Sequence, residues 1–186
     1  MQKQMDQIGV IHGRFQILHN DHMVYLLAGK ERCKHLIIGI TNPDPFRTKY
    51  EVSDPNRNLP SSNPLNYYQR YQMISAAFDE AGIPYSEYSI VPFPINHPKL
   101  YKYYLPLDAV HFLTIYDKWG ADKLDKFKQL GLQTKVMWQR NLKDKGINAS
   151  QVRKLILTDG DWQKLVPDAV AELLKKWEIK EILQKC

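Results

Sequence analysis

The chain has 186 residues, 44% of them hydrophobic, which suits one globular domain with a sizeable core and requires no second domain. Its N-terminus lacks the apolar core of a signal peptide, and no apolar run approaches the ~20 residues of a membrane helix, so we expect no membrane partner. The net charge of +6 favours anionic partners such as nucleotides, whereas the lack of a long basic tract or a nucleic-acid-binding motif argues against nucleic acid.

The two cysteines predict a cellular compartment. Cys33 and Cys186 are far apart in the sequence and form no Cys-x-x-Cys pair. A reducing setting with free thiols is the simplest interpretation, so we expect a cytoplasmic protein.

The N-terminal stretch predicts a strand, a tight turn and a helix. Residues 8–11 have the pattern of a short buried strand, and from 19 to 33 the apolar spacing becomes helical. Gly13 allows a sharp bend, and Asn20 or Asp21 can cap the helix. The free backbone N–H groups of its first turn form a natural anion site.

Potential donor side chains surround this turn. His19 and His22 are three residues apart, which places both on one face of the first helical turn, near Arg14. They could instead be ordinary surface histidines, with Asp21 favouring the helix dipole, or metal ligands. No Cys or His cluster supplies the other ligands of a structural zinc site, so we expect no metal held by protein side chains. Neither a dinucleotide fingerprint nor a P-loop follows the strand.

A long loop is predicted over residues 42–66, which contain five prolines and no periodicity. Such loops are commonly lids or binding loops, and Arg47, Lys49 and Arg57 could reach phosphates there. The alternative is a disordered insertion that only aids solubility.

The rest of the chain alternates between predicted strands and helices. Strands are expected at 35–40, 88–92, 108–115 and 134–138, helices at 66–81, 99–104, 118–130 and from Asn148 or Ser150 onward, and a C-terminal helical segment at 161–186. This alternation predicts an α/β fold, a doubly wound, mostly parallel sheet with helices on both faces. The lysines of the last helix indicate a solvated face.

Several motifs resemble one family. Gly13-Arg14-Phe15-Gln16, followed by His19 and His22, resembles the first signature of the HIGH-type nucleotidyltransferases, G-x-F-x-P-x-H-x-G-H. The Gly-Arg-Phe-Gln opening is most similar to archaeal-type nicotinamide mononucleotide (NMN) adenylyltransferases. Further collinear matches are Asn63-Pro64-Leu65-Asn66-Tyr67-Tyr68-Gln69-Arg70 with N-P-F-T-x-x-E-R, Lys99-Leu100-Tyr101 with Arg-Leu-Trp, Ile147-Asn148-Ala149-Ser150-Gln151-Val152-Arg153 with I-S-x-T-x-I-R, and 161–167 with the segment after it.

The resemblance implies a Rossmann-like nucleotidyltransferase fold and a reaction, adenylyl transfer from ATP to NMN that gives NAD and pyrophosphate. Mg²⁺ would be carried mainly by the nucleotide. Family relatives often form oligomers, which leaves a homo-oligomer open. The implied catalytic residues are Arg14, His19, His22 and Arg153; the implied nucleotide-binding residues are Gly13, Phe15, Gln16, Arg47, Asn148 and Ser150; the implied acceptor-binding residues are Thr41, Asn42, Asn96 and Tyr101, the last by stacking on a flat base.

Two residues of the first signature depart from the family pattern. Ile17 replaces its Pro, and Asp21 replaces the Gly before the second His. Asp21 either points away and caps the helix, or contacts a hydroxyl or base and indicates a different donor or acceptor. Two alternatives therefore stay open: a nucleotidyltransferase of the same fold that uses ATP or CTP on another phosphorylated small molecule, and a nucleotide-binding module without turnover.

Overall fold

The computed structural model describes residues 5–44, 59–144 and 146–186. Its centre is a sheet of five parallel strands in the order β3-β2-β1-β4-β5. The strands are β1 (Asp6–Gly13), β2 (Cys33–Thr41), β3 (Tyr88–Phe93), β4 (Val110–Ile115) and β5 (Thr134–Gln139). The helices are α1 (Asn20–Lys30), α2 (Tyr67–Glu80), α3 (Lys118–Gln129), α4 (Ala149–Leu157), α5 (Asp168–Lys176) and α6 (Ile179–Gln184). The predicted parallel α/β sheet is confirmed.

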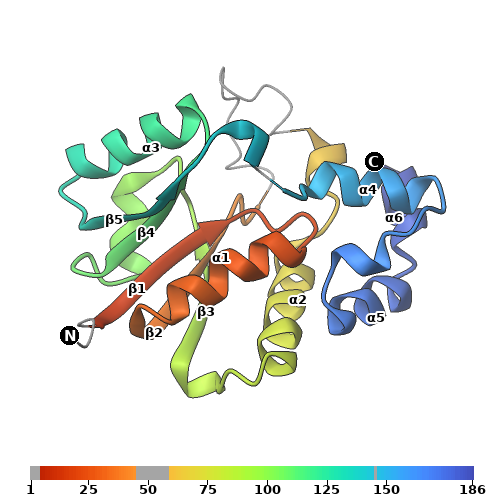
Figure 1. The fold of residues 1–186 in the computed structure, drawn as a ribbon, viewed down its shortest axis with the longest axis horizontal. Helices are drawn as coiled ribbons and strands as arrows, with labels where there is room; N and C mark the ends of the chain where they lie inside the picture. The colour runs from red at the N-terminus through yellow and green to blue at the C-terminus, as the bar shows by residue number, and fades with distance from the viewer. Residues whose placement is uncertain (1–4, 45–58, 145) are drawn as a thin grey trace.

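Two apolar clusters lie on opposite faces of the sheet, because successive strand residues point to opposite faces. Ile11 belongs to the cluster shared with α1, α2 and the C-terminal helices, whereas the preceding Val10 belongs to the cluster shared with α3. Figure 1 shows α1 and α2 along one side of the sheet and α3 beside β4 and β5. The prediction of helices on both faces is therefore confirmed.

Some element boundaries differ from the sequence-based expectation. The first helix ends at Lys30 rather than at Cys33, since Cys33 is fully buried and pairs with Asp6 as the first residue of β2. The segment expected as a short helix at 99–104 is a 3₁₀ turn over Pro98–Tyr103. Of the predicted loop 42–66, residues 45–58 lie outside the described part of the chain, and with them Arg47, Lys49 and Arg57.

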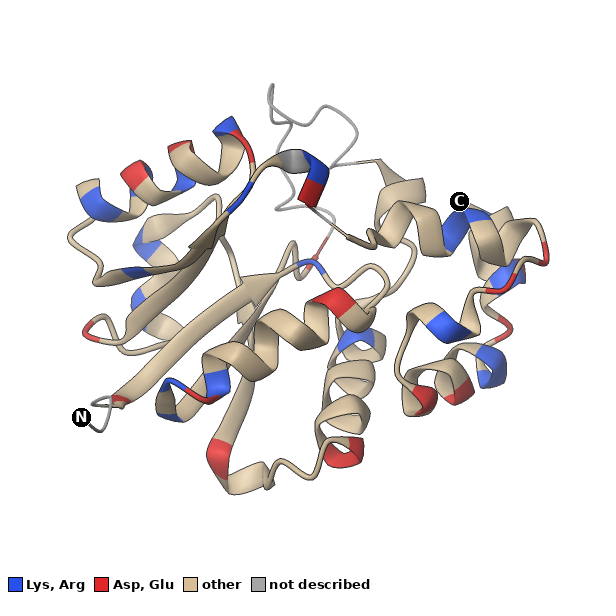
Figure 2. Ribbon diagram, in the orientation of Figure 1, with Lys and Arg blue, Asp and Glu red and all other residues tan. Residues whose placement is uncertain are grey.

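The C-terminal segment forms α5 and α6, which pack against α2 and α4 respectively. The two helices are separate because Glu178 has a φ of +53° between them. Figure 2 shows Lys and Arg interleaved with Asp and Glu along α3 and in these C-terminal helices. Cys33 is buried and Cys186 exposed, and both thiols are free. Across the described residues, every helix is too short or too polar to cross a membrane.

Candidate nucleotide-binding site

The sheet order places a cavity at the carboxyl ends of the strands. From β1 the chain leads through α1 to β2 on one side, and from β4 through α3 to β5 on the other, so β1 and β4 flank the point where the winding reverses. Ligands of doubly wound sheets bind there. The cavity at this point has a volume of about 700 Å³ and is lined by 12–16, 19, 21, 22, 25, 41, 42, 95, 114, 116, 117, 119, 120, 123, 138, 146–150 and 153.

His19 caps the start of α1, a role that we predicted for Asn20 or Asp21. Its extended backbone ends the β1–α1 turn, and its Nδ1 accepts a hydrogen bond from the backbone N–H of His22 at 3.4 Å. An accepting Nδ1 carries no proton, so the neutral ring has its proton on Nε2. His19 is buried. This geometry makes Nε2 a hydrogen-bond donor.

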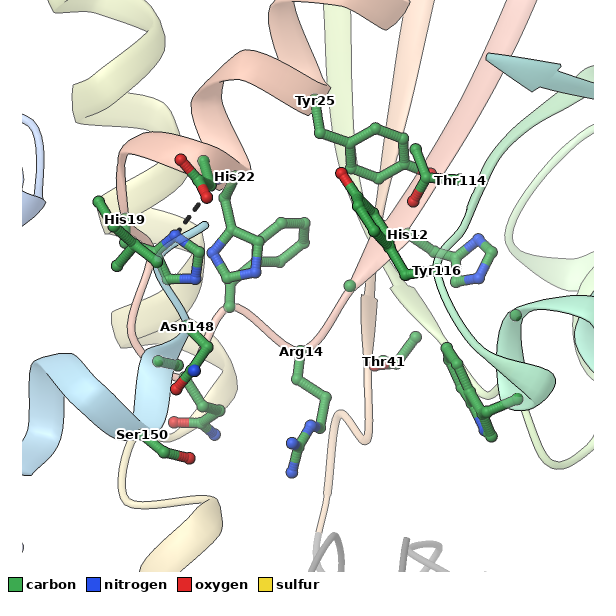
Figure 3. Close-up of a pocket in the computed structure, with 18 of the residues that line it drawn as sticks. His12, Arg14, His19, His22, Tyr25, Thr41, Thr114, Tyr116, Asn148 and Ser150 are labelled. Carbon is green, nitrogen blue, oxygen red and sulfur yellow. Dashed lines mark hydrogen bonds between the residues drawn. The ribbon is translucent and has the colours of Figure 1, made fainter. Parts of the chain in front are cut away.

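The rings of His19 and His22 stack with centroids 3.7 Å apart, which confirms that both side chains share one face of the first turn. The buried ring of Phe15 supports His22 edge-on at 5.1 Å. Gly13 makes room for that ring, because a Cβ at Gly13 would lie 2.9 Å from it. Figure 3 shows the two histidines on one side of the cavity, near Asn148 and Ser150.

The α4 helix presents a second N-terminus to the cavity. Asn148 caps it, accepting from the Gln151 N–H at 3.0 Å, while the Gln151 side chain accepts from the Asn148 N–H at 2.9 Å. Arg153 donates to Ser150 Oγ at 3.2 Å and to the Gln16 carbonyl, and burial lowers the pKa of its guanidinium. Arg153 thereby joins α4 to the turn after β1.

Buried Arg70 connects three segments beside the cavity by hydrogen bonds to their backbone carbonyls. Its guanidinium donates to the carbonyls of Arg14, Thr41 and Asn42 at 3.1, 2.8 and 2.8 Å, and its Nε donates to the Asn66 carbonyl at 3.2 Å. Burial lowers its pKa to about 10. The residue links the ends of β1 and β2 to the start of α2, and sequence analysis noted it only as part of a motif.

Gln16 lies in the same layer. Its side-chain amide both accepts from the Leu65 N–H, at 2.9 Å, and donates to the Leu65 carbonyl, at 2.8 Å. The amide therefore fixes the segment before α2, and the side chain is buried with both of its polar atoms engaged by Leu65.

Aromatic residues line the opposite side of the cavity. Trp138 Nε1 donates to the Tyr116 hydroxyl at 2.7 Å, and Tyr25 meets Trp138 edge-on at 6.0 Å. Lys123 Nζ lies 4.4 Å from the centroid of Trp119. Sequence analysis missed these residues. For Tyr116, Trp119 and Trp138, the signal that could have found them is their position directly after β4, at the start of α3 or at the end of β5, which is the edge where such sheets bind ligands. Tyr25 lies within α1 and carries no such signal.

Most of the predicted site residues meet in this cavity. Those that line it are Gly13, Arg14, Phe15, Gln16, His19, His22, Thr41, Asn42, Asn148, Ser150 and Arg153. Asn96 is half-buried beside the lining residue Ile95 but is not itself part of the lining, and Arg47 lies outside the described residues.

Tyr101 corrects one prediction. It is 1% exposed, its ring lies 4.6 Å from that of Phe93, and its hydroxyl donates to the Ile95 carbonyl at 2.7 Å. The apolar cluster beneath α3 covers the ring. Tyr101 is therefore a core residue and does not stack on a ligand in this cavity.

Asp21 also lines the cavity. A Cβ added to Gly146 would overlap its Oδ2, so the start of α1 and the segment before α4 meet at this carboxylate. Of the two roles considered for Asp21, capping falls to His19. Among the described residues, no group of three His, Cys, Asp or Glu side chains is arranged to hold a metal ion.

Comparison with known proteins identifies the family. Residues 10–155 match the family model described as cytidylyltransferase-like. The chain is 50% identical over 179 residues to a phosphonoformate cytidylyltransferase of Streptomyces viridochromogenes, covering 96% of each chain. It is 29% identical over 175 residues to a nicotinamide-nucleotide adenylyltransferase of Thermococcus sibiricus, covering 94% of this chain and 85% of that relative.

A solved structure shows the same fold. The crystal structure of a bifunctional NMN adenylyltransferase/ADP ribose pyrophosphatase from Francisella tularensis, complexed with AMP and a manganese ion, superposes with a TM-score of 0.67 at 17% identity. The match covers 97% of this chain and 52% of that one, so the chain spans about half of that protein. The fold, the motifs and the family match agree, and the chain belongs to the cytidylyltransferase-like family of nucleotidyltransferases.

Proposed function

We propose that the protein transfers a cytidylyl group from CTP to a small phosphonate or phosphate acceptor, with phosphonoformate as the first acceptor to test, and releases pyrophosphate. The observation that carries this proposal is the 50% identity to a phosphonoformate cytidylyltransferase along 96% of both chains. A cavity lined by two helix N-termini, the stacked pair His19 and His22, and Arg153 supports it, because such a site suits a triphosphate.

The reaction needs donors rather than a general base. An oxygen of the acceptor, already ionised at neutral pH, attacks the α-phosphorus of CTP; a new P–O bond forms, the bond between the α-phosphorus and the bridging oxygen breaks, and pyrophosphate leaves with that electron pair. Catalysis then consists of aligning two anions and stabilising the charge on the α-phosphate and the leaving group.

We assign this role to the side chains on the α1 and α4 side of the cavity. His19 and His22 would donate to the phosphate oxygens, with Arg14 and Arg153 supplying positive charge and Asn148 and Ser150 at the second helix N-terminus. We assign Thr41 and Asn42, which line the cavity at the end of the neighbouring strand β2, to binding of the acceptor.

Mg²⁺ is expected to arrive on the triphosphate. Because the described residues hold no cluster of three metal-ligating side chains, the nucleotide phosphates and water would supply most of its ligands. The ion would neutralise charge on the phosphates when bound.

Adenylylation of NMN is the second candidate, supported by relatives such as the one at 29% identity. The burial of Tyr101 counts against it, because the stacking residue inferred from the sequence is a core residue. Trp119 or Trp138 would have to take that role.

The test is pyrophosphate release with Mg²⁺-CTP and phosphonoformate beside Mg²⁺-ATP and NMN, on wild type, His22→Ala and the control His35→Ala, which changes a histidine outside the cavity. Release with CTP and phosphonoformate, lost only in His22→Ala, supports the proposal. Release only with ATP and NMN would replace it by the second candidate. Nucleotide binding without pyrophosphate release in the presence of any phosphonate, phosphate or mononucleotide acceptor would indicate a binding module.

A further inference from the structure

Asp21 occupies a defined place in the cavity. It lies in the first turn of α1, and its carboxylate lies against Gly146, where an added Cβ would overlap Oδ2 unless the side chain moved. Asn148, two residues further along, caps α4. The carboxylate therefore lies between the two helix starts that we assign to the donor nucleotide.

The charge of Asp21 decides which part of the nucleotide it can contact. A carboxylate is only a hydrogen-bond acceptor and repels phosphate oxygens, so the triphosphate belongs with Arg14, Arg153 and the histidines. The nucleoside is then left for Asp21. Among the described residues, no side chain or backbone N–H donates a hydrogen bond to this carboxylate, although it lines the cavity. A ligand N–H or O–H would supply that donor.

We propose that Asp21 accepts a hydrogen bond from the amino group of the cytosine ring and thereby selects CTP over UTP. This inference rests on the proposed function. Cytosine presents an amino group where uracil presents a carbonyl oxygen, and a carboxylate attracts the first and repels the second. Adenine also carries an amino group, so the contact rejects UTP rather than ATP. The glycine usual at this position of the HIGH-type pattern has no side chain to make such a contact.

The experiment measures equilibrium binding of Mg²⁺-CTP, Mg²⁺-UTP and Mg²⁺-dCTP without an acceptor. The proteins are wild type, Asp21→Asn, Asp21→Gly and the control Asp122→Asn, which changes an exposed aspartate of α3 outside the cavity. Asp21→Asn preserves the side-chain volume and replaces an acceptor by an amide that also donates. Thermal unfolding of each variant checks that it is folded.

In wild type and Asp122→Asn we expect CTP to bind more tightly than UTP. In Asp21→Asn the CTP/UTP affinity ratio falls about tenfold, because the amide oxygen still accepts from cytosine but without the charge, and the amide N–H groups can now donate to the carbonyl oxygen of uracil. Asp21→Gly loses the preference for CTP as well. An unchanged CTP/UTP ratio in Asp21→Asn, or equal binding of both nucleotides by wild type, overturns the proposal.

The measurement with dCTP distinguishes a contact of Asp21 with the base from a contact with the ribose. If Asp21→Asn loses discrimination between CTP and dCTP while its CTP/UTP ratio stays at the wild-type value, the carboxylate contacts the ribose 2′-hydroxyl and the proposal is wrong. The proposed reaction can fail independently of this contact. If no pyrophosphate is released but the CTP/UTP affinity ratio still depends on Asp21, the proposed reaction is wrong and the proposed contact with the base stands.

Discussion

The two walls of the cavity are built differently. The wall formed by the starts of α1 and α4 consists of capped helix N-termini, stacked histidines and a tethered arginine. The wall formed by the ends of β4 and β5 and the start of α3 carries the aromatic side chains of Tyr116, Trp119 and Trp138, together with Thr114, Asp117, Gly120 and Lys123. Figure 3 shows His19 and His22 on one side of the cavity and Tyr116 on the other. The first wall is suited to phosphate chemistry, and the second to recognition of what the phosphates carry.

The largest effect on the rate is expected from a substitution in the wall formed by the starts of α1 and α4. His22→Ala removes a side chain that we propose donates to the phosphates, and the rate of pyrophosphate release should fall about 10²–10³-fold, as for the loss of one oxyanion donor. Steady-state assays of His22→Ala and His35→Ala make the measurement. A rate for His22→Ala within twofold of wild type would show that this wall does not carry the chemistry.

The next effect concerns Arg70, which links the ends of β1 and β2 to the start of α2 beside the cavity. Arg70→Lys retains the charge but cannot reach the four carbonyls that Arg70 contacts, so the free energy of unfolding should fall by about 3 kcal/mol. Urea unfolding compares it with Arg32→Lys, an arginine outside the cavity. Equal stability of both variants would mean that the hydrogen bonds of Arg70 do not stabilise the fold.

The core beneath α3, behind the aromatic wall, should be acid-sensitive. His111 is fully buried against Phe127, at a ring distance of 5.0 Å, and burial lowers its pKa to about 4. The unfolded chain binds a proton near pH 6.5, whereas the folded chain does so only near 4. Stability is therefore complete above pH 6.5 and falls by about 3 kcal/mol as pH drops to 4.

Denaturant unfolding at pH 7.5 and 4.5 measures this loss, with His111→Phe as the comparison. The substitution removes the titrating ring, so its pH-dependent loss should be smaller than that of wild type, whatever its absolute stability. The same loss in both proteins would contradict the assignment to His111.

The smallest effects separate a core aromatic residue from one in the cavity. Tyr101→Phe removes the hydrogen bond to the Ile95 carbonyl and should lower the free energy of unfolding by about 1 kcal/mol, with KM unchanged. Trp119→Ala should raise the KM of either CTP or the acceptor about two- to tenfold. Thermal unfolding of both variants measures the change in stability, and substrate titrations measure the change in KM. A raised KM in Tyr101→Phe would show that Tyr101 contributes to substrate binding after all.

The strands and the two helix starts could be predicted from the sequence. Residues 35–40 form a continuous apolar run, and the strand there follows from that run alone. The stacking of His19 on His22 follows from their spacing within one turn. The capping of α4 follows from an Asn three residues before Gln151. Each of these features depends on residues within a few positions of one another.

Only the tertiary structure decided which distant residues meet. The amide of Gln16 binds Leu65, 49 residues away, and Arg153 reaches the Gln16 carbonyl, 137 residues away. Tyr101 was expected in the cavity and lies in the core, because the cluster beneath α3 encloses its ring. A local pattern fixes the backbone conformation, which depends on neighbouring residues. The environment of a side chain depends on which strands become neighbours, and the packing of the whole sheet determines that.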